Sequence, residues 1–458
     1  MLKIARRLSA ARTDRDPDAG FSIVEVLVAT LIFMLLSLGI AQATVTSIRL
    51  SGDQKHRVTA LSLAAGEIDK VRAIGDPFNV DDATTTSAID GITYKVVRVT
   101  QWVAADGTDI PCGGSGTANL QVKRINVSVT WTGQLGNTLP VKSDTVLAPV
   151  GRINDPTQGT IIIAATRADG SGSSGVTPTV TPVSGGATSL TTAPPATDSD
   201  GCSYALRVVP GVYKVALSKS NYVDITQSSN PSLNVTVVAG STVTAPFGYD
   251  LAANFNMTYA PGKPAGTLFA TNAEMSFVNT YGTSYVSGSP TTASLYPWAA
   301  GYVPIAGHYI APTQLSDGCR SVDPSEWPAG NISGGPDLAA GDHGAAVAAG
   351  PGASAAMTLN MGLVTVNSSK SGSLSVTSAT PISGWGDPGC GTSMTYNFGS
   401  INANTDTTIA LPFGSWTASV ATSWWVGPAT VTVTPLSNVT PGLVSGTTFM
   451  LDPRAAAS

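Results

Sequence analysis

Charged side chains are scarce in this sequence, and their scarcity excludes several classes of protein. Only 12% of the 458 residues are Asp, Glu, Lys or Arg, about half the fraction found in an ordinary soluble domain. The formal net charge is −5, so nucleic-acid binding by a basic patch is not expected. Gly (48) and Pro (30) are frequent instead. This composition predicts short strands separated by turns, and the length predicts about three domains.

Metal ligands and catalytic groups are also few. The sequence has three histidines and four cysteines without a Cys-x-x-Cys pair, so no metal site is expected. It lacks a Gly-x-Ser-x-Gly elbow, which makes an exterior hydrolase the weakest hypothesis. Asp198-Ser199-Asp200-Gly201 begins like a calcium loop but lacks the later acidic ligands, so we expect a hairpin turn there. His343 is expected to be solvated. We therefore predict a protein that is not an enzyme and needs no cofactor.

The cysteines are widely spaced at Cys112, Cys202, Cys319 and Cys390. Disulfides are permitted outside the cytoplasm, and four cysteines allow three pairings that the sequence does not separate. Cys112 lies in a Gly-rich loop, where a paired cysteine and a free thiol both remain open.

One long apolar run stands near the N-terminus. Residues 21–43 carry a single ionisable side chain, Glu25, and as a helix they are long enough to cross ~30 Å of hydrocarbon. Residues 1–20 precede this run and are rich in Lys and Arg, which predicts a cytoplasmic leader and an extracytoplasmic bulk. A carboxylate inside such a run is expensive in lipid and predicts a functional role.

The junction has the sequence Gly20-Phe21-Ser22-Ile23-Val24-Glu25-Val26-Leu27. It resembles the type IV prepilin processing signal of pilins and type II secretion pseudopilins. The resemblance implies that a prepilin peptidase cuts after Gly20 and N-methylates Phe21, and that Glu25 helps to dock the subunit into a filament. A buried carboxylate needs a partner, and the free amine of Phe21 on a neighbouring subunit would supply one. The alternative is a plain membrane anchor in which Glu25 is accidental.

The helix is expected to continue beyond the membrane. Apolar residues recur at three- and four-residue steps from Val58 to Ile74, which is typical of an amphipathic helix, and Gly75-Asp76-Pro77 is a stop signal. Alternating segments at 94–100 and 123–131 predict strands, with a third at 141–150 and a hairpin turn at Gly136-Asn137. This order resembles the heads of minor pilins, and Trp102 and Trp131 are expected in the core of the sheet.

The exterior part is predicted to be β-rich. An Asp200-Gly201 turn, a strand, Pro210-Gly211 and Tyr213-x-Val215 resemble the carboxypeptidase-regulatory-like β-sandwich, a structural or adhesive module. Residues 168–196 are predicted to be mostly loops, with one strand near 179–181. The segment 411–420 echoes the Pro-Gly-x-Tyr-x-Val piece and suggests a second, related sandwich.

The fold class predicted is an α+β pilin module, with a long transmembrane and amphipathic helix on a small antiparallel sheet, followed by all-β Ig-like or prealbumin-like sandwiches. The predicted divisions are a leader at 1–20, the helix at 21–75 with its span at about 21–43, a pilin head at 76–150, a sandwich at 151–250, a β-rich insert with a Gly/Ala loop at 251–360, and a second sandwich at 361–458.

The function predicted is that of a structural subunit in a type IV pilus-like filament, specifically a minor pilin with a large adhesion or tip module. Expected partners are the prepilin peptidase, other pilin subunits, the membrane, and a surface, glycan or protein ligand. Trp424-Trp425 is a candidate aromatic contact for that ligand. The location expected is a single-pass membrane precursor and then a cell-surface filament. Alternatives are a type II secretion pseudopilin and an uncleaved single-pass surface protein.

Overall fold

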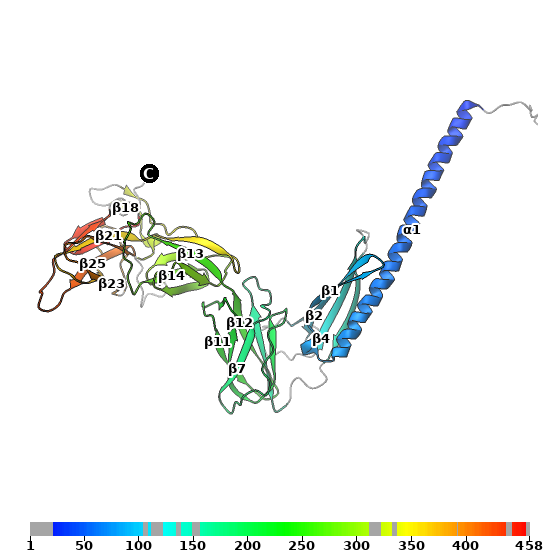
Figure 1. Cartoon of the computed structure of the whole chain (residues 1–458), viewed down its shortest axis with the longest axis horizontal. Helices are drawn as coiled ribbons and strands as arrows, with labels where there is room; N and C mark the ends of the chain where they lie inside the picture. Colours follow the sequence, from blue (N-terminus) through cyan, green and yellow to red (C-terminus); the bar gives the residue numbers. More distant parts are fainter. Residues whose placement is uncertain are drawn as a thin grey trace, which may run out of the picture. The chain divides into compact units, whose positions relative to one another are not determined.

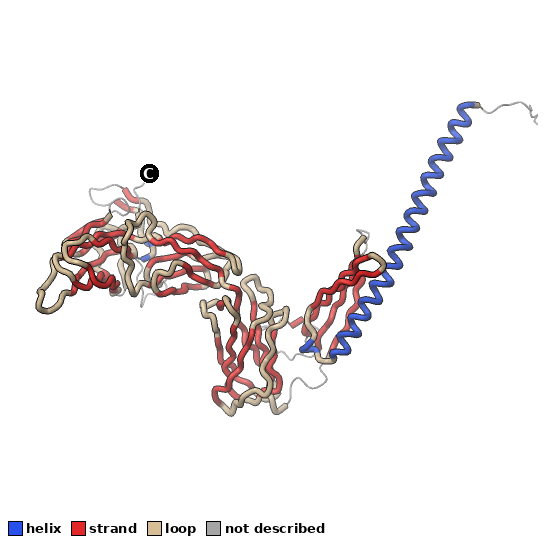
Figure 2. Tube along the Cα trace, viewed as in Figure 1, coloured by secondary structure: helices blue, strands red, loops and turns tan. Residues whose placement is uncertain are grey.

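The computed structural model describes most of the chain outside the leader. The described residues are 22–103, 109–110, 122–133, 139–148, 156–310, 322–331, 337–391, 393–436 and 442–454. They divide into two compact units, one of residues 1–101 with 122–148 and the other of residues 102–121 with 149–458. The predicted architecture of one long N-terminal helix followed by many, mostly antiparallel, β-sheets is confirmed (Figure 2).

The helix α1 spans Ile23–Ile74 without a break. Ser22 caps its start, with its hydroxyl accepting a hydrogen bond from the Val24 amide at 3.3 Å, as expected for an N-cap serine. Gly75 ends the helix in the left-handed conformation, at φ 72°, and its N–H bonds to the Val71 carbonyl. Glycine adopts this conformation without the steric cost that other residues meet. The 3-10 helix η1, Pro77–Asn79, follows.

A five-stranded antiparallel sheet packs on the C-terminal half of α1 (Figure 1). Its order is β1-β2-β4-β5, with β3 paired to β2. The strands are β1 Ala83–Ile89, β2 Ile92–Val103, β3 Asp109–Ile110, β4 Val122–Trp131 and β5 Val141–Leu147. Ala60, Ala64, Ile68 and Val71 of the helix join the buried side chains of β2 and β4, including Trp131, in one core. Trp102 is also buried, but it is not among the side chains of this cluster.

The sequence analysis missed strand β1. It pairs with β2 through a two-residue turn, in which Asp90 (φ 51°) and Gly91 (φ 76°) both have positive φ. This is the conformation of a type I′ hairpin turn, for which Asp-Gly is a favoured pair. The signal was therefore present in the sequence. The hairpin turn predicted at Gly136-Asn137 lies outside the described residues.

The strands from residue 159 to residue 251 form two facing sheets. One has the order β10-β12-β6-β8 and the other β11-β9-β7. Side chains from both sheets share one buried core. The bounds are β6 Gly159–Thr166, β7 Thr177–Ser184, β8 Cys202–Val208, β9 Gly211–Ser218, β10 Tyr222–Asp224, β11 Ser232–Val237 and β12 Thr242–Leu251. Strand β7 is longer than the short strand predicted within the loops at 168–196, and its pairing with β9 continues across a register shift.

Most of the remaining strands contribute to one large core. Its buried side chains run from Ala253 to Leu451, so no break in the core marks the predicted division between residues 360 and 361. The bounds are β13 Ala253–Tyr259, β14 Glu274–Asn279, β15 Gly282–Ser287, β16 Thr292–Leu295, β17 Val303–Ala306, η4 Pro324–Glu326, β18 Gly330–Asn331, β19 Asp337–Leu338, β20 Ser354–Leu359, β21 Gly362–Ser368, β22 Gly372–Ser378, β23 Thr395–Ile401, β24 Thr407–Leu411, β25 Gly414–Ala421, β26 Val431–Pro435, β27 Gly442–Ser445 and β28 Thr448–Leu451.

Candidate functional site

The N-terminal half of α1 exposes an unbroken apolar surface. Its large side chains, from Ile23 to Leu50, are mostly half or more exposed. Among the described residues, α1 is the one helix long and apolar enough to span a membrane, and none of that span is buried within the chain. Exposed apolar surface of this extent marks a membrane or protein contact.

Glu25 lies in the first turn of this helix. Its side chain is exposed, and its backbone N–H bonds to the Ser22 carbonyl at 2.9 Å. A carboxylate near a helix N-terminus interacts favourably with the helix dipole, which offsets part of its cost in an apolar setting. Gly20 and Phe21 lie outside the described residues.

The C-terminal half of α1 is fastened to its sheet by a buried ion pair. Arg98 of β2 donates to the Glu67 carboxylate at 2.7 Å, and the two side chains are 13% and 7% exposed. Lys70, which is largely exposed, makes a second contact with Glu67 at 3.2 Å. Sequence spacing did not indicate this pair, because its members are 31 residues apart.

The four cysteines divide into two groups. Cys202 and Cys390 are both disulfide-bonded, and within the described part of the chain no cysteine is free. Cys112 and Cys319 lie outside the described residues.

The segment Asp198-Ser199-Asp200-Gly201, where a turn was expected, is a turn held by the Asp198 side chain. Asp198 accepts hydrogen bonds from the amides of Asp200 (3.0 Å) and Cys202 (2.8 Å), so its carboxylate is engaged locally. Over the residues that the structure describes, no group of three or more His, Cys, Asp or Glu side chains could hold a metal ion.

The histidines each contact a polar neighbour. His56 lies 2.9 Å from the Tyr94 hydroxyl, and His308 lies 2.7 Å from Glu274. The expectation that His343 is only solvated is wrong, because its Nδ1 lies 3.0 Å from the buried carboxylate of Asp323. Sequence spacing did not indicate this pair, since 20 residues separate its members.

Trp424 and Trp425 are both exposed, at 88% and 70%. Two adjacent residues in a strand would point to opposite faces of the sheet. Trp424 and Trp425 lie in a turn instead, closed by a hydrogen bond from the Val426 amide to the Ser423 carbonyl. This turn leaves both rings exposed to solvent, with their centroids 5.4 Å apart.

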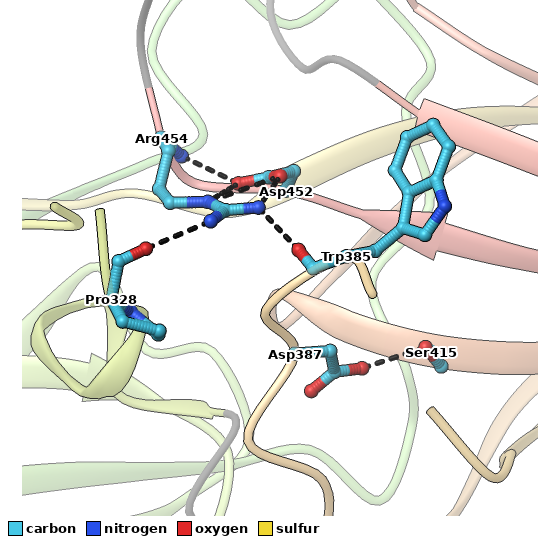
Figure 3. A network of polar contacts seen from close by, with 6 residues as sticks. All are labelled: Pro328, Trp385, Asp387, Ser415, Asp452 and Arg454. Atoms are coloured by element: carbon cyan, nitrogen blue, oxygen red, sulfur yellow. Dashed lines mark hydrogen bonds and ion pairs between the residues drawn. The ribbon is translucent and has the colours of Figure 1, made fainter. Parts of the chain in front are cut away.

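A buried polar cluster joins the end of the described chain to two loops (Figure 3). Arg454 pairs with Asp452 at 2.7 Å, and it also donates to the carbonyls of Pro328 (2.8 Å) and Trp385. Nearby, Asp387 accepts from the Ser415 hydroxyl at 2.6 Å. These groups form hydrogen bonds and an ion pair with one another in the interior. The cluster therefore stabilises the fold, and its polar groups are not available to a ligand.

A cleft that the sequence analysis did not predict opens between β10 and β13. Asn221, Tyr222, Asn254 and Ser294 are among the residues that line it. No local signal links these residues, because Asn254 and Ser294 meet through the pairing of two strands.

Comparison with known proteins adds one match to a family model. Residues 15–41 match the prokaryotic N-terminal methylation motif. No protein of curated function matches the sequence.

Three similar solved structures share little sequence with the chain. The Bacillus anthracis TIE protein is 11% identical, with 82% of this chain and 71% of that chain covered and a TM-score of 0.17. A streptococcal ancillary pilin is 10% identical, with 40% and 63% covered and a TM-score of 0.18. A form of the major pilin subunit BcpA of Bacillus cereus is 11% identical, with 66% and 96% covered and a TM-score of 0.18. At this level of similarity, function is argued from the chain's own residues.

Proposed function

We propose that this chain is a structural subunit of a type IV pilus-like filament and acts without catalysis. The observation that carries the proposal is the methylation motif at residues 15–41, which leads directly into the 52-residue helix α1. The exposed apolar half of that helix suits first the membrane and then a bundle of neighbouring helices. One face of its other half is already covered by the sheet.

In this proposal, a prepilin peptidase cuts the precursor after Gly20 and methylates the amine of Phe21. Glu25 then pairs with the Phe21 amine of an adjacent subunit. Burial of either charge alone is unfavourable, whereas the pair compensates both. Before cleavage, the leader remains cytoplasmic and the sheets lie outside the membrane.

The size of the exterior part favours a minor pilin at a filament tip. The unit that contains residues 149–458 is much larger than the helix–sheet unit, and a bulky head is hard to repeat along a tightly packed fibre. Its first two facing sheets suit a carboxypeptidase-regulatory-like module, and we assign the exterior part an adhesive role. A secretion pseudopilin needs no such added surface.

Processing is tested by intact-mass and N-terminal analysis of the full chain from membranes, with and without the peptidase. We expect N-methyl-Phe21 as the first residue only when the peptidase is present. A Gly20→Val variant, which adds a side chain at the cut, is expected to keep the leader. A chain that starts at Met1 under both conditions would support the uncleaved surface protein instead.

Assembly is tested separately with Glu25→Gln, which keeps the shape and removes the charge. We expect normal cleavage but little incorporation into fibres. Asp53→Asn, which removes a partly exposed carboxylate further along the same helix, is the matched control and should assemble normally. Gold labelling of the exterior part should mark fibre ends, and labels at regular intervals along the fibre would contradict the tip position.

A further inference from the structure

A cleft of about 640 Å³ lies between the first pair of facing sheets and the strands that follow. Its volume is within the range of roughly 300–1,000 Å³ that is usual for small-molecule sites. Asn221 and Tyr222 line one wall, and Asn254 and Ser294 line the other. Ser229 adds a further hydroxyl.

The lining combines these polar side chains with the apolar side chains of Val223, Leu251 and Ala252, and it carries no charged residue. The Ser294 hydroxyl donates to the Asn254 side-chain oxygen at 2.8 Å, which orients that amide. Among the described residues, the Asn254 amide nitrogen, the Asn221 side chain and the Tyr222 hydroxyl have no hydrogen-bond partner. These groups supply both donors and acceptors toward a ligand.

This chemistry selects among ligand classes. An apolar ligand would remove the amides and hydroxyls from water without replacing their hydrogen bonds, which is unfavourable. An anionic or cationic ligand would find no opposite charge in the lining. A neutral polyol satisfies the polar groups, and the carbon face of a sugar ring can pack on an aromatic ring.

Tyr222 supplies such a ring, and its neighbours hold it in place. It is half-buried; the Lys219 ammonium lies 4.2 Å from its ring centroid, and the Tyr249 ring lies 5.5 Å away. Lys219 is itself fastened by a hydrogen bond to the Ser174 carbonyl at 2.7 Å. The ring therefore presents a fixed surface rather than a freely rotating one.

The two walls are tied together by Gln227, which follows β10. Its side-chain oxygen accepts from the Tyr296 amide at 2.6 Å, and its nitrogen donates to the Tyr302 hydroxyl at 3.3 Å. Burial raises the pKa of Tyr302 to about 12, so that hydroxyl stays protonated at neutral pH. The Ala252 amide also donates to the Asn221 carbonyl at 2.9 Å.

A fixed pair of walls reduces the entropy cost of binding. We propose that this cleft binds a neutral glycan residue, with Asn221 and Asn254 bonded to its hydroxyls and the Tyr222 ring against its carbon face. The inference deepens the adhesive part of the proposed function and rests on it, but it is independent of cleavage and filament assembly.

The test uses the full chain in detergent and immobilised neutral glycans that end in glucose, galactose or N-acetylglucosamine. Sialylated glycans serve as the charged comparison. We expect binding to at least one neutral probe, weakened tenfold or more by Asn254→Ala and by Tyr222→Ala. Tyr222→Phe keeps the ring and should lose less affinity than Tyr222→Ala.

Asn256→Ala is the matched control, because Asn256 lies on the same strand and is exposed but does not line the cleft. It should bind like the unchanged chain. Thermal unfolding of each variant identifies any that fail to fold, and Asn254→Asp then provides a second, nearly isosteric change that should weaken binding.

Three outcomes would overturn the inference. They are no neutral glycan bound at millimolar concentration, equal binding by the cleft variants and the unchanged chain, and loss of binding on Trp424→Ala rather than on the cleft changes. The last result would place the ligand at the exposed tryptophan turn. Cleavage after Gly20 is measured in a separate assay, so failure of the filament proposal and failure of the glycan proposal are distinguishable.

Discussion

Tyr213 and Trp416 make the same hydrogen bond in two different parts of the exterior. Each follows the first glycine of its strand, Gly211 in β9 or Gly414 in β25, by two residues. The Tyr213 hydroxyl donates to the carbonyl four residues earlier, that of Val209, at 2.9 Å. The Trp416 indole donates to Pro412 in the same way, at 3.0 Å. The weak sequence echo between these segments thus has a shared local geometry.

Tyr213→Phe should destabilise the first pair of facing sheets by about 1–3 kcal/mol, the cost of leaving buried polar groups unsatisfied. The lost hydroxyl serves both the Val209 carbonyl and the Thr188 amide, while the ring remains in the core. Hydrogen exchange of β9 amides in urea measures the effect. Tyr281→Phe, at a largely exposed position, is the control and should change little; equal effects would refute the role given to the Tyr213 hydroxyl.

Arg98→Met should destabilise the helix–sheet unit by about 3–5 kcal/mol, because it leaves the buried Glu67 carboxylate without its main partner. Hydrogen exchange in the C-terminal half of α1 is the measurement. Arg72→Ala removes an exposed pair with Asp69 at 3.8 Å and an exposed hydrogen bond to the Thr145 hydroxyl at 3.2 Å, and it should cost less than Arg98→Met because exposed contacts contribute little. The double variant Arg98→Met with Glu67→Leu should recover most of the loss. No recovery would argue against the ion pair as the cause.

Arg454→Ala should also destabilise, by about 3–5 kcal/mol, because it leaves the fully buried Asp452 carboxylate without its ionic partner. The guanidinium serves Asp452 and two backbone carbonyls at once, a geometry that a lysine ammonium does not reproduce. Arg454→Lys is therefore expected to rescue only part of the stability. Limited proteolysis of the loops around Pro328 and Trp385 would report the change, and unchanged cleavage there would contradict it.

Asp387→Asn should alter the pH dependence of stability near β25. Burial raises the pKa of the Asp387 carboxyl, and the hydrogen bond from Ser415 opposes this rise. The folded chain then keeps the proton at a pH where the unfolded chain, with an ordinary pKa of about 3.9, has lost it. This contribution to stability is complete below the ordinary pKa, and it is lost as pH rises through the raised folded pKa.

The measurement is urea unfolding followed by hydrogen exchange in β25, between about pH 4 and pH 7. The stability of Asp387→Asn relative to the unchanged chain should increase with pH across this window. Ser415→Ala removes a group that lowers the pKa, so it should move the loss of stability to a higher pH than in the unchanged chain. If the stability of all three proteins changed with pH in the same way, the pKa of the Asp387 carboxyl would not differ between the folded and the unfolded chain.

Local sequence determined the helix and the processing motif. The helix α1 can be predicted from the sequence because its apolar residues recur every three or four positions and because Ser22 and Gly75 mark its two ends. The Asp90-Gly91 turn was equally local, and attention to that pair would have revealed β1. Such features need only interactions between residues close in the chain.

Tertiary structure alone decided which distant side chains meet. Arg98 reaches Glu67 only because β2 packs on α1, and Ser294 reaches Asn254 only because β16 pairs with β13. The cleft likewise needs two groups of strands held together through Gln227. Strand pairing has many registers compatible with the same alternating pattern, and the register chosen depends on packing across the whole core. The sequence alone therefore determined the individual elements and the N-terminal signal. The tertiary structure decided which ion pairs form, which strands share a core and where the candidate glycan cleft lies.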